Sequence, residues 1–192
     1  MTQKPELLKF WKDNFGFTDA ELNAFREVNR EDFIPQELRS AAYHDMPIMT
    51  HALELESGEK VFEVGTGSAY QAAIIARIVG ARGKVITTEA VPELVSFAKQ
   101  NLRKAGIKNV FVYEEDGSKG MPSEAPFDKI IITAACKEFP KPLIEQLKPN
   151  GMIVGPVGSQ QEQEMVRGVK DKNGHLELEF LGQFLFTPMY GK

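Results

Sequence analysis

The fold is decided by the stretch Val61-Phe62-Glu63-Val64-Gly65-Thr66-Gly67-Ser68-Ala69-Tyr70. It begins as a short apolar strand and passes through a turn with two glycines into a predicted helix. Because glycine has no Cβ, such a turn lets the backbone approach a ligand closely. The free N–H groups at the start of the helix then point toward that ligand. With Glu63 two positions before the first glycine, the stretch predicts a site for a nucleoside-type cofactor.

The spacing of the glycines narrows the class of cofactor. A dinucleotide fingerprint requires Gly-x-Gly-x-x-Gly or Ala, but Tyr70 occupies its last position. The stretch also lacks the Lys-Ser/Thr ending of a triphosphate-binding loop. It looks instead like the S-adenosylmethionine loop of Rossmann-like methyltransferases. A strand, turn and helix without a ligand remains the alternative interpretation of these residues alone.

The composition is that of an ordinary globular protein of 192 residues with a net charge of −4. A mildly acidic chain is a poor general binder of nucleic acid or anionic membranes. The sequence shows neither an apolar run as long as a membrane span nor a signal-peptide pattern. The single cysteine, Cys136, excludes an intrachain disulfide, and His44, His51 and Cys136 do not have the spacing of metal ligands. We therefore expect a cytoplasmic protein with no metal, and with neither nucleic acid nor membrane as partner.

The chain is expected to form a single domain, with a helical cap over residues 1–57 and a cofactor-binding sheet over residues 58–192. A capping-box pattern at Thr18–Glu21 and apolar residues at helical spacing predict the helices of the cap. The alternation of strand and helix patterns beyond Gly58 predicts an α/β protein with a doubly wound, mostly parallel sheet. Two strand-like runs on either side of Asn173-Gly174 predict a C-terminal antiparallel hairpin. A plain dinucleotide-binding domain would not be expected to end in such a hairpin. The predicted strands are Lys60–Val64, Lys84–Thr88, Asn109–Tyr113, Asp128–Thr133, Met152–Val157, Met165–Lys170 and Leu176–Phe186, and the predicted helices of the sheet part are Tyr70–Val79, one that begins at Pro92, and Pro140–Leu147.

Three groups of residues follow the carboxyl ends of successive predicted strands, where open α/β sheets bind ligands. The loop Gly65–Ser68 suits the carboxylate and ribose side of the cofactor. Glu89 offers two acceptor oxygens to the vicinal hydroxyls of a ribose. Asp116 can accept from an adenine amino group, and Gly117 permits close approach of the ring. Taken singly, Glu89 is compatible with a solvated strand end and Asp116-Gly117 with a common turn, but their order on successive strands favours a cofactor site.

The sequence resembles the protein-L-isoaspartate (D-aspartate) O-methyltransferase family from about Leu7 to Tyr190. The most specific runs are Gly-Thr-Gly-Ser-x-Tyr-Gln at 65–71 and Thr-Ala-Ala at 133–135. Other matching segments are Phe25-Arg26-Glu27-Val28 with Phe33 and Pro35, Ala42-Tyr43-His44-Asp45, Asp116-Gly117-Ser118-Lys119-Gly120, Phe127-Asp128-Lys129-Ile130-Ile131-Ile132, Pro142-Leu143-Ile144-Glu145-Gln146-Leu147 and Pro156-Val157-Gly158.

The resemblance implies a Rossmann-like, S-adenosylmethionine-dependent methyltransferase of the EC 2.1.1 class. Its acceptor would be the α-carboxylate of isoaspartyl residues in damaged proteins or peptides, a repair reaction in which the ester closes to a succinimide. A carboxylate is already a nucleophile at neutral pH, so the reaction needs orientation and exclusion of water rather than a general base. The implied cofactor contacts are Glu63, Gly65, Thr66, Gly67, Ser68, Glu89, Asp116 and Gly117, and Thr133 would border the acceptor side.

The sequence departs from the family in two places. The family carries a Gln-Thr-Ile-Ser-x-Pro loop, which covers the cofactor and supplies a hydroxyl beside the substrate, where Pro47-Ile48 here leads directly into Met49-Thr50. We therefore expect a divergent member that lacks this loop, with Thr50 as the nearest hydroxyl and the catalytic residue unknown. The second departure is Ala69, where many relatives have glycine; its methyl group is expected to matter little if φ is negative there.

Three other functions stay open from the sequence. The missing loop is compatible with a methyltransferase of the same fold that has a different acceptor. It is also compatible with a cofactor-binding homologue with little catalysis, because positioning and water exclusion would both suffer. An NAD-dependent oxidoreductase is disfavoured by Tyr70 and by the predicted C-terminal hairpin.

Overall fold

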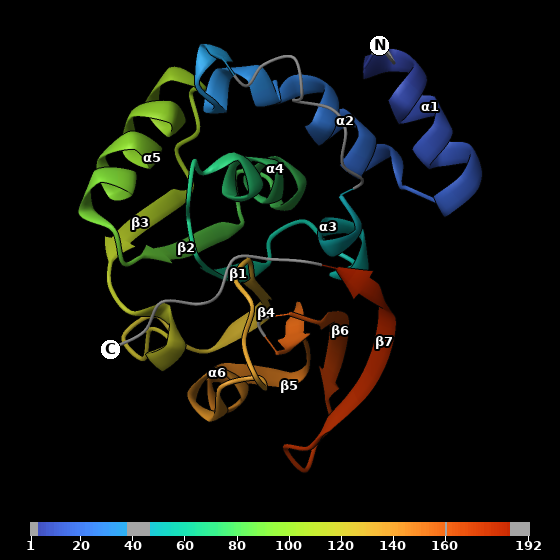
Figure 1. Cartoon of the computed structure of the whole chain (residues 1–192), viewed down its shortest axis with the longest axis vertical. Coiled ribbons are helices and arrows are strands. Elements are labelled where there is room, and N and C mark those ends of the chain that lie inside the picture. Colours follow the sequence, from blue (N-terminus) through green and yellow to red (C-terminus); the bar gives the residue numbers. More distant parts are fainter. Residues whose placement is uncertain (1–3, 38–46, 160, 185–192) are drawn as a thin grey trace.

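The computed structural model describes residues 4–37, 47–159 and 161–184. Its described strands form one seven-stranded sheet in the order β3-β2-β1-β4-β5-β6-β7 (Figure 1). Strands β1 to β5 run parallel, whereas β6 pairs antiparallel with both β5 and β7. This mixed sheet, with its antiparallel C-terminal part and N-terminal helices, confirms the predicted fold class. The strands are β1 Lys60–Val64, β2 Lys84–Glu89, β3 Val110–Glu114, β4 Phe127–Ile132, β5 Leu147–Gly158, β6 Gln163–Lys170 and β7 Leu176–Phe184.

The helices cover both faces of the sheet. They are α1 Lys4–Phe15, α2 Asp19–Glu27, α3 Ile48–Ala52, α4 Tyr70–Val79, α5 Pro92–Lys104 and α6 Lys141–Gln146, with short 3₁₀ turns η1 Arg30–Phe33 and η3 Gly117–Lys119. Figure 1 shows α4 between the N-terminal helices and the sheet, and α6 on the opposite side.

Successive residues of each strand belong to two different layers of the core, because side chains alternate across a sheet. Val61 of β1 packs in one buried cluster with side chains of α1, α2, α4 and α5. Its neighbour Phe62 lies in a second cluster with Leu143 of α6. Between these two layers, the carboxyl ends of the parallel strands lie together at one edge of the sheet. The predicted site lies at this edge.

The N-terminal helices are fastened to α3 by a small polar group. As predicted, Thr18 and Glu21 form a capping box, in which the Thr18 N–H donates to Glu21 Oε2 over 2.7 Å. The other oxygen of Glu21 lies 3.0 Å from His51 Nδ1, and the His51 ring stacks on Phe17 with 4.4 Å between centroids. His51 is therefore a packing residue, while His44 lies outside the described residues.

Strand β5 is longer than the sequence indicated. It begins at Leu147, which pairs with Phe127 of β4, rather than at Met152. The intervening Pro149 and Asn150 are typical turn residues, and Asn150 has a φ of +62°. The pairing of Leu147 with β4 therefore extends the strand across residues whose local sequence predicts a turn. The C-terminal hairpin is confirmed as far as Phe184, and the last two residues of its predicted second strand lie outside the described residues.

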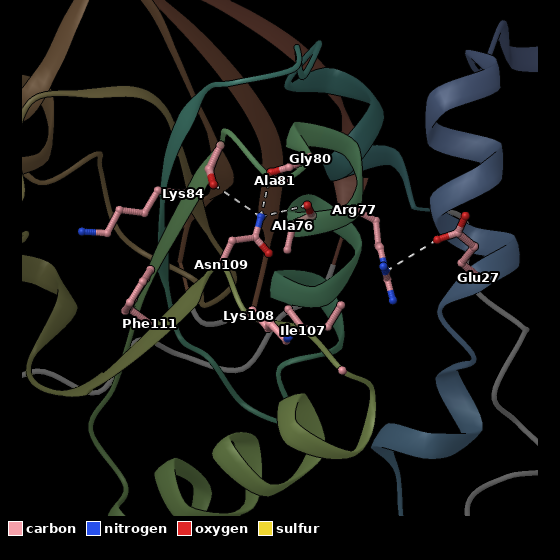
Figure 2. Close-up of a pocket in the computed structure, with 12 residues that line it drawn as sticks. Glu27, Ala76, Arg77, Gly80, Ala81, Lys84, Ile107, Lys108, Asn109 and Phe111 are labelled. Atoms are coloured by element: carbon pink, nitrogen blue, oxygen red, sulfur yellow. Dashed lines mark hydrogen bonds and ion pairs between the residues drawn. The ribbon is translucent and has the colours of Figure 1, made fainter.

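Asn109, just before β3, closes the carboxyl end of α4. Its side-chain Nδ2 donates to the main-chain oxygens of Ala76, Gly80 and Gly83 over 3.1, 3.0 and 3.4 Å (Figure 2). Two of these oxygens also accept from the main chain, since the N–H of Gly80 donates to Ala76 O and the N–H of Gly83 donates to Gly80 O. Asn109 thus adds a second donor at the end of the helix, where carbonyl groups lack the usual helical partner. Asn109 also lines a hollow of about 610 Å³ with Arg77. This hollow lies where β2 and β3 begin, at the end of the sheet opposite to the one where α/β proteins bind cofactors.

We expect Asn109→Ala to lower the free energy of unfolding by roughly 2 kcal/mol, because the bonds from one side chain to three half-buried carbonyl groups are lost at once. Urea unfolding followed by circular dichroism measures the loss. Asn14→Ala is the matched control, since Asn14 is exposed and donates to one helical carbonyl, that of Phe10; it should change stability by less than about 0.5 kcal/mol. Equal losses in the two variants would contradict the role of Asn109.

Candidate functional site

The loop Gly65–Ser68 joins β1 to α4 and is fixed to the end of β2. The N–H groups of Gly65 and Thr66 both donate to Thr88 O, over 2.9 and 3.0 Å. Gly65 and Gly67 have positive φ angles of +91° and +52°, which glycine adopts without a steric cost. The sequence therefore placed glycine at two positions where the turn requires it.

Ala69 has a φ of +66°, so the condition under which its methyl group was expected to matter little, a negative φ, is not met. It is the N-cap of α4 and its methyl group is fully buried. The conformation is set by the turn itself, since the Ala69 N–H donates to Thr66 O over 2.8 Å. A residue with a Cβ in this left-handed region costs roughly 1 kcal/mol relative to the right-handed one, and the protein accepts this cost to start the helix here.

Thr133, directly after β4, holds the loop from the other side. Its hydroxyl donates toward Val64 O and Gly65 O, at 2.9 and 2.7 Å. A Cβ added to Gly65 would lie 2.6 Å from this same hydroxyl oxygen. The structure thus brings Thr133 to the glycine loop, as expected for a residue bordering the site, but its hydroxyl is engaged by the main chain.

Glu89 ends β2, and one of its two carboxylate oxygens is bonded to the loop. Oε2 accepts from the Gly67 N–H over 2.9 Å, and Oε1 accepts from the Val91 N–H over 3.1 Å. A carboxylate has about four acceptor positions, so each oxygen can still accept from a ligand hydroxyl. Glu89 is 9% exposed, so a ligand can reach its carboxylate although the side chain is largely shielded from water.

The turn after β3 reaches the same edge of the sheet. Asp116 Oδ1 accepts from the N–H and the hydroxyl of Ser118, over 3.0 and 2.7 Å, and so starts the 3₁₀ turn. Gly117 is buried between the first two strands, because a Cβ there would lie 2.5 Å from Thr88 Oγ1 and 2.6 Å from Val64 Cγ1. All three predicted groups, from three different strand ends, therefore meet around the end of β1.

Glu63 lies beneath the loop and is fully buried. The Thr87 hydroxyl donates to its Oε2 over 2.6 Å, while Oε1 has no hydrogen-bond partner among the described residues. Burial, and to a lesser degree the charge of Glu89, raises the pKa of Glu63 to about 8. The side chain is therefore mostly protonated at neutral pH.

Two further predicted residues, Ser68 and Thr50, have side chains that are hydrogen-bonded within the protein. Ser68 Oγ accepts from the Tyr70 N–H over 3.4 Å. The carbonyl of Ser68 accepts from the Asn101 side chain over 3.0 Å. Thr50 in α3 is fully buried, and its hydroxyl accepts from Gln71 Nε2 over 2.7 Å. Both its burial and this bond separate the Thr50 hydroxyl from solvent.

Asn101 is a structural support of the loop that the sequence interpretation missed. It is 2% exposed and lies on the buried side of α5. The signal was a polar residue three positions after Ala98 on an otherwise apolar helix face. A buried amide needs a partner, and here that partner is the glycine loop.

The structure shows no sign of metal chemistry or thiolate chemistry in its described part. Within residues 4–37, 47–159 and 161–184, no three His, Cys, Asp or Glu side chains are grouped so as to hold a metal ion. Burial raises the pKa of the Cys136 thiol to about 11, so it is not a thiolate nucleophile at neutral pH. No helix in the described part of the chain is both long and apolar enough to span a membrane.

The arrangement suits a ligand with hydroxyl groups, an amino group and a positive charge. The two glycines of the loop form one side, and the carboxyl groups of Glu89 and Asp116 form the other. The buried, unpartnered oxygen of Glu63 adds a further acceptor next to the loop. These acceptors match an adenosyl group that carries an amino acid and a sulfonium.

Comparison with known proteins gives a consistent result. The family model described as protein-L-isoaspartate(D-aspartate) O-methyltransferase (PCMT) matches residues 2–192. The protein-L-isoaspartate O-methyltransferase of Methanococcoides burtonii is 41% identical over 193 residues, covering 92% of this chain and 95% of the relative. The protein of the same name from Pyrococcus horikoshii is 43% identical over 177 residues, covering 92% and 80%.

Two solved structures share the fold. One named protein-L-isoaspartate O-methyltransferase has a TM-score of 0.86 at 26% identity, covering 98% of this chain and 66% of that one. A second, from Plasmodium falciparum in complex with S-adenosyl-L-homocysteine, has a TM-score of 0.81 at 22% identity and covers 99% of both chains.

Proposed function

Because this chain belongs to the protein-L-isoaspartate (D-aspartate) O-methyltransferase family, we propose that it methylates the α-carboxylate of isoaspartyl residues in damaged proteins or peptides, with S-adenosylmethionine as methyl donor. The observation that carries this proposal is the meeting of three strand ends around the glycine loop, in the order of the family's motifs. It is an enzyme of the EC 2.1.1 class, and its activity is protein repair.

The cofactor contacts that we propose are Glu63, Gly65, Thr66, Gly67, Ser68, Glu89, Asp116 and Gly117. The support for Glu89 is its nearly dry carboxylate, which retains acceptor positions for two ribose hydroxyls. The support for Gly117 is its packing against β1 and β2, which leaves no room for a side chain. Asp116, the neighbour of Gly117 in the chain, is the proposed acceptor for the adenine amino group.

S-adenosylmethionine supplies a methyl group that is already activated by the positive sulfur. The acceptor carboxylate is ionised at neutral pH, since its usual pKa is near 4. The task of the chain is then to hold the acceptor in line and to exclude water. Thr133, at the edge of the loop, is the residue that we propose to border the acceptor.

We further propose that the chain lacks the covering loop of its family. The support is the sequence, in which Pro47 leads directly into α3; residues 38–46 lie outside the described part. Thr50 in α3 does not replace the family's serine in this proposal, because its hydroxyl is buried and engaged by Gln71. The catalytic role of a hydroxyl therefore stays unassigned.

We expect Thr50→Val to leave kcat within about threefold of wild type and to cost about 1 kcal/mol of stability, because only the bond to Gln71 is lost. Initial rates with an isoaspartyl peptide and thermal unfolding measure the two effects. Thr50→Ser, which keeps the hydroxyl, is the control. A fall in kcat of more than about 100-fold, of the size found when an electrostatic catalytic donor is removed, would show that Thr50 acts on the substrate.

The test of the proposed function uses cofactor labelled in its methyl group and an isoaspartyl peptide. We expect a base-labile ester that releases labelled methanol, and no release from the same peptide with a normal aspartyl bond. Equal release from the two peptides would overturn the proposal. Methylation of another carboxylate with none on the isoaspartyl peptide would support the second candidate, a related methyltransferase with a different acceptor, which the missing loop favours. Tight cofactor binding without turnover of any acceptor would indicate a cofactor-binding homologue with little catalysis.

For the organisation of the chain we propose a single domain of residues 1–192, with residues 1–57 as cap and 58–192 as cofactor-binding sheet. The support is the shared core in which α1 and α2 pack with α4. We also propose that it acts in the cytoplasm, with neither nucleic acid nor membrane as partner. The net charge of −4 supports the second part of this proposal, because a negative chain repels nucleic acid and anionic membranes.

A further inference from the structure

Glu63 has an incomplete set of partners for a buried acid. Its side chain is 0% exposed, and only one of its two oxygens accepts a hydrogen bond, from Thr87. The other oxygen, Oε1, has no partner among the described residues. Burying an ionised carboxylate in this state is costly, so before a ligand binds the group is held as the neutral acid.

The charged groups on the surrounding elements do not compensate a negative charge on Glu63. On β2, Glu89 has the same sign and disfavours ionisation. On β4, the Lys129 ammonium lies 3.6 Å from Glu59. On the helices above this face, Arg77 of α4 pairs with Glu27, and His51 of α3 lies against Glu21. Each of these described cations is directed to another acid.

Glu63 is connected to the cofactor loop through two hydroxyl groups. The Thr87 hydroxyl, which donates to Glu63, lies 2.8 Å from the Thr66 hydroxyl. Because Thr87 gives its one proton to Glu63, Thr66 donates to Thr87. Thr66 in turn is part of the loop that follows β1. A change in the charge of Glu63 therefore alters the hydrogen bonds that reach the loop. In the same way, a charge bound above the loop alters the free energy of ionising Glu63.

We propose that Glu63 determines the specificity of the site for the positively charged cofactor over its neutral-sulfur product, by releasing its proton to solvent when S-adenosylmethionine binds. The inference rests on the proposed function, since it requires this cofactor. S-adenosylmethionine carries one more positive charge than S-adenosylhomocysteine, the product of methyl transfer. In a dry site that extra charge favours the carboxylate, and after transfer the carboxylate takes a proton back, which weakens the hold on the product.

Calorimetric titration of the full chain with each ligand between pH 6.5 and pH 8.5 tests this proposal, without any need for turnover. A single acid with a pKa of about 8 that ionises on binding makes the affinity rise roughly 20-fold over this range. We expect a rise of that order for S-adenosylmethionine and a much smaller one for S-adenosylhomocysteine. Titrations in two buffers with different heats of ionisation should show release of close to one proton per cofactor at pH 7.

Glu63→Gln supplies the reference, because it imitates the protonated acid and keeps the acceptor for Thr87. It should bind more weakly than wild type already at pH 6.5, and the gap should widen about 20-fold between pH 6.5 and pH 8.5. Its profile also records the titration of the ligand's own amino group, which falls in the same range. A purely structural role for Glu63 would instead lower affinity equally at every pH, and that result would overturn the proposal.

Thr87→Val gives a second readout that does not change Glu63 itself. Loss of the hydrogen bond that favours the carboxylate should move the midpoint of the affinity profile to higher pH. A midpoint that stays in place, or wild-type affinity that is independent of pH, would overturn the inference and leave the cofactor assignment intact. Failure to bind S-adenosylmethionine at any pH would overturn both.

Discussion

Gly65→Ala is expected to weaken S-adenosylmethionine binding by at least about 100-fold and to lower the free energy of unfolding by roughly 3 kcal/mol. The new Cβ would lie 2.6 Å from the Thr133 hydroxyl oxygen, at a φ of +91°. Thr133 cannot yield without losing its contacts to Val64 O and Gly65 O. The loop must therefore move, and with it the residues Gly65–Ser68 that we propose as cofactor contacts. Calorimetry and urea unfolding measure the two losses.

Gly58→Ala is a closely matched control. Gly58 has nearly the same φ, +92°, but a Cβ there meets nothing within 4 Å. It shares the backbone strain and lacks the clash, so it should cost about 1 kcal/mol and leave cofactor affinity unchanged. Addition of Thr133→Ala to Gly65→Ala should recover part of the loss, because the clashing atom is removed. Equal effects of the two glycine variants would mean that Thr133 does not explain the requirement for Gly65.

The local pattern of the sequence was sufficient for the central elements. The bounds of β1 and α4 agree with the prediction because an apolar run, two glycines and a helical pattern all indicate the same structure there. The start of β5 could not be predicted, since it depends on pairing between Leu147 and Phe127 that no local pattern encodes. The φ of Ala69 was missed because alanine gives no signal for a left-handed residue, and the turn imposes it.

The predicted site residues meet in space because parallel strands bring their carboxyl ends to one edge. This geometry follows from the strand order, so Glu89, Asp116 and Gly117 could be named from the sequence alone. What each residue does depends on packing. The burial of Glu63 and Thr50, and the bond from Asn101 to Ser68, are set by α3, α4 and α5 packing on the sheet. Sequence spacing contains no measure of that burial.

Glu89→Ala is expected to reduce the affinity for S-adenosylmethionine about 100-fold. Two charge-assisted bonds, from the N–H groups of Gly67 and Val91, are lost together with the proposed acceptor for the ribose hydroxyls. The loss of affinity comes from the two bonds that the carboxylate is proposed to accept from the ribose hydroxyls. At roughly 1.5 kcal/mol each, the lower end for a charged acceptor, they total near 3 kcal/mol, which corresponds to the stated loss. Calorimetry at one fixed pH measures it.

Glu114→Ala controls for the loss of one negative charge at the same edge of the sheet. Glu114 is the register partner of Glu89 on β3, but it is exposed, and no hydrogen bond ties it to the glycine loop in the described structure. It should change affinity by less than about twofold, as expected for an exposed charge in high dielectric. Glu89→Gln should fall between the two, because an amide keeps one acceptor oxygen but opposes its NH₂ to a second N–H donor. If Glu89→Ala bound the cofactor as tightly as Glu114→Ala, then Glu89 would not contact the ribose, and the orientation proposed for the adenosyl group would be wrong.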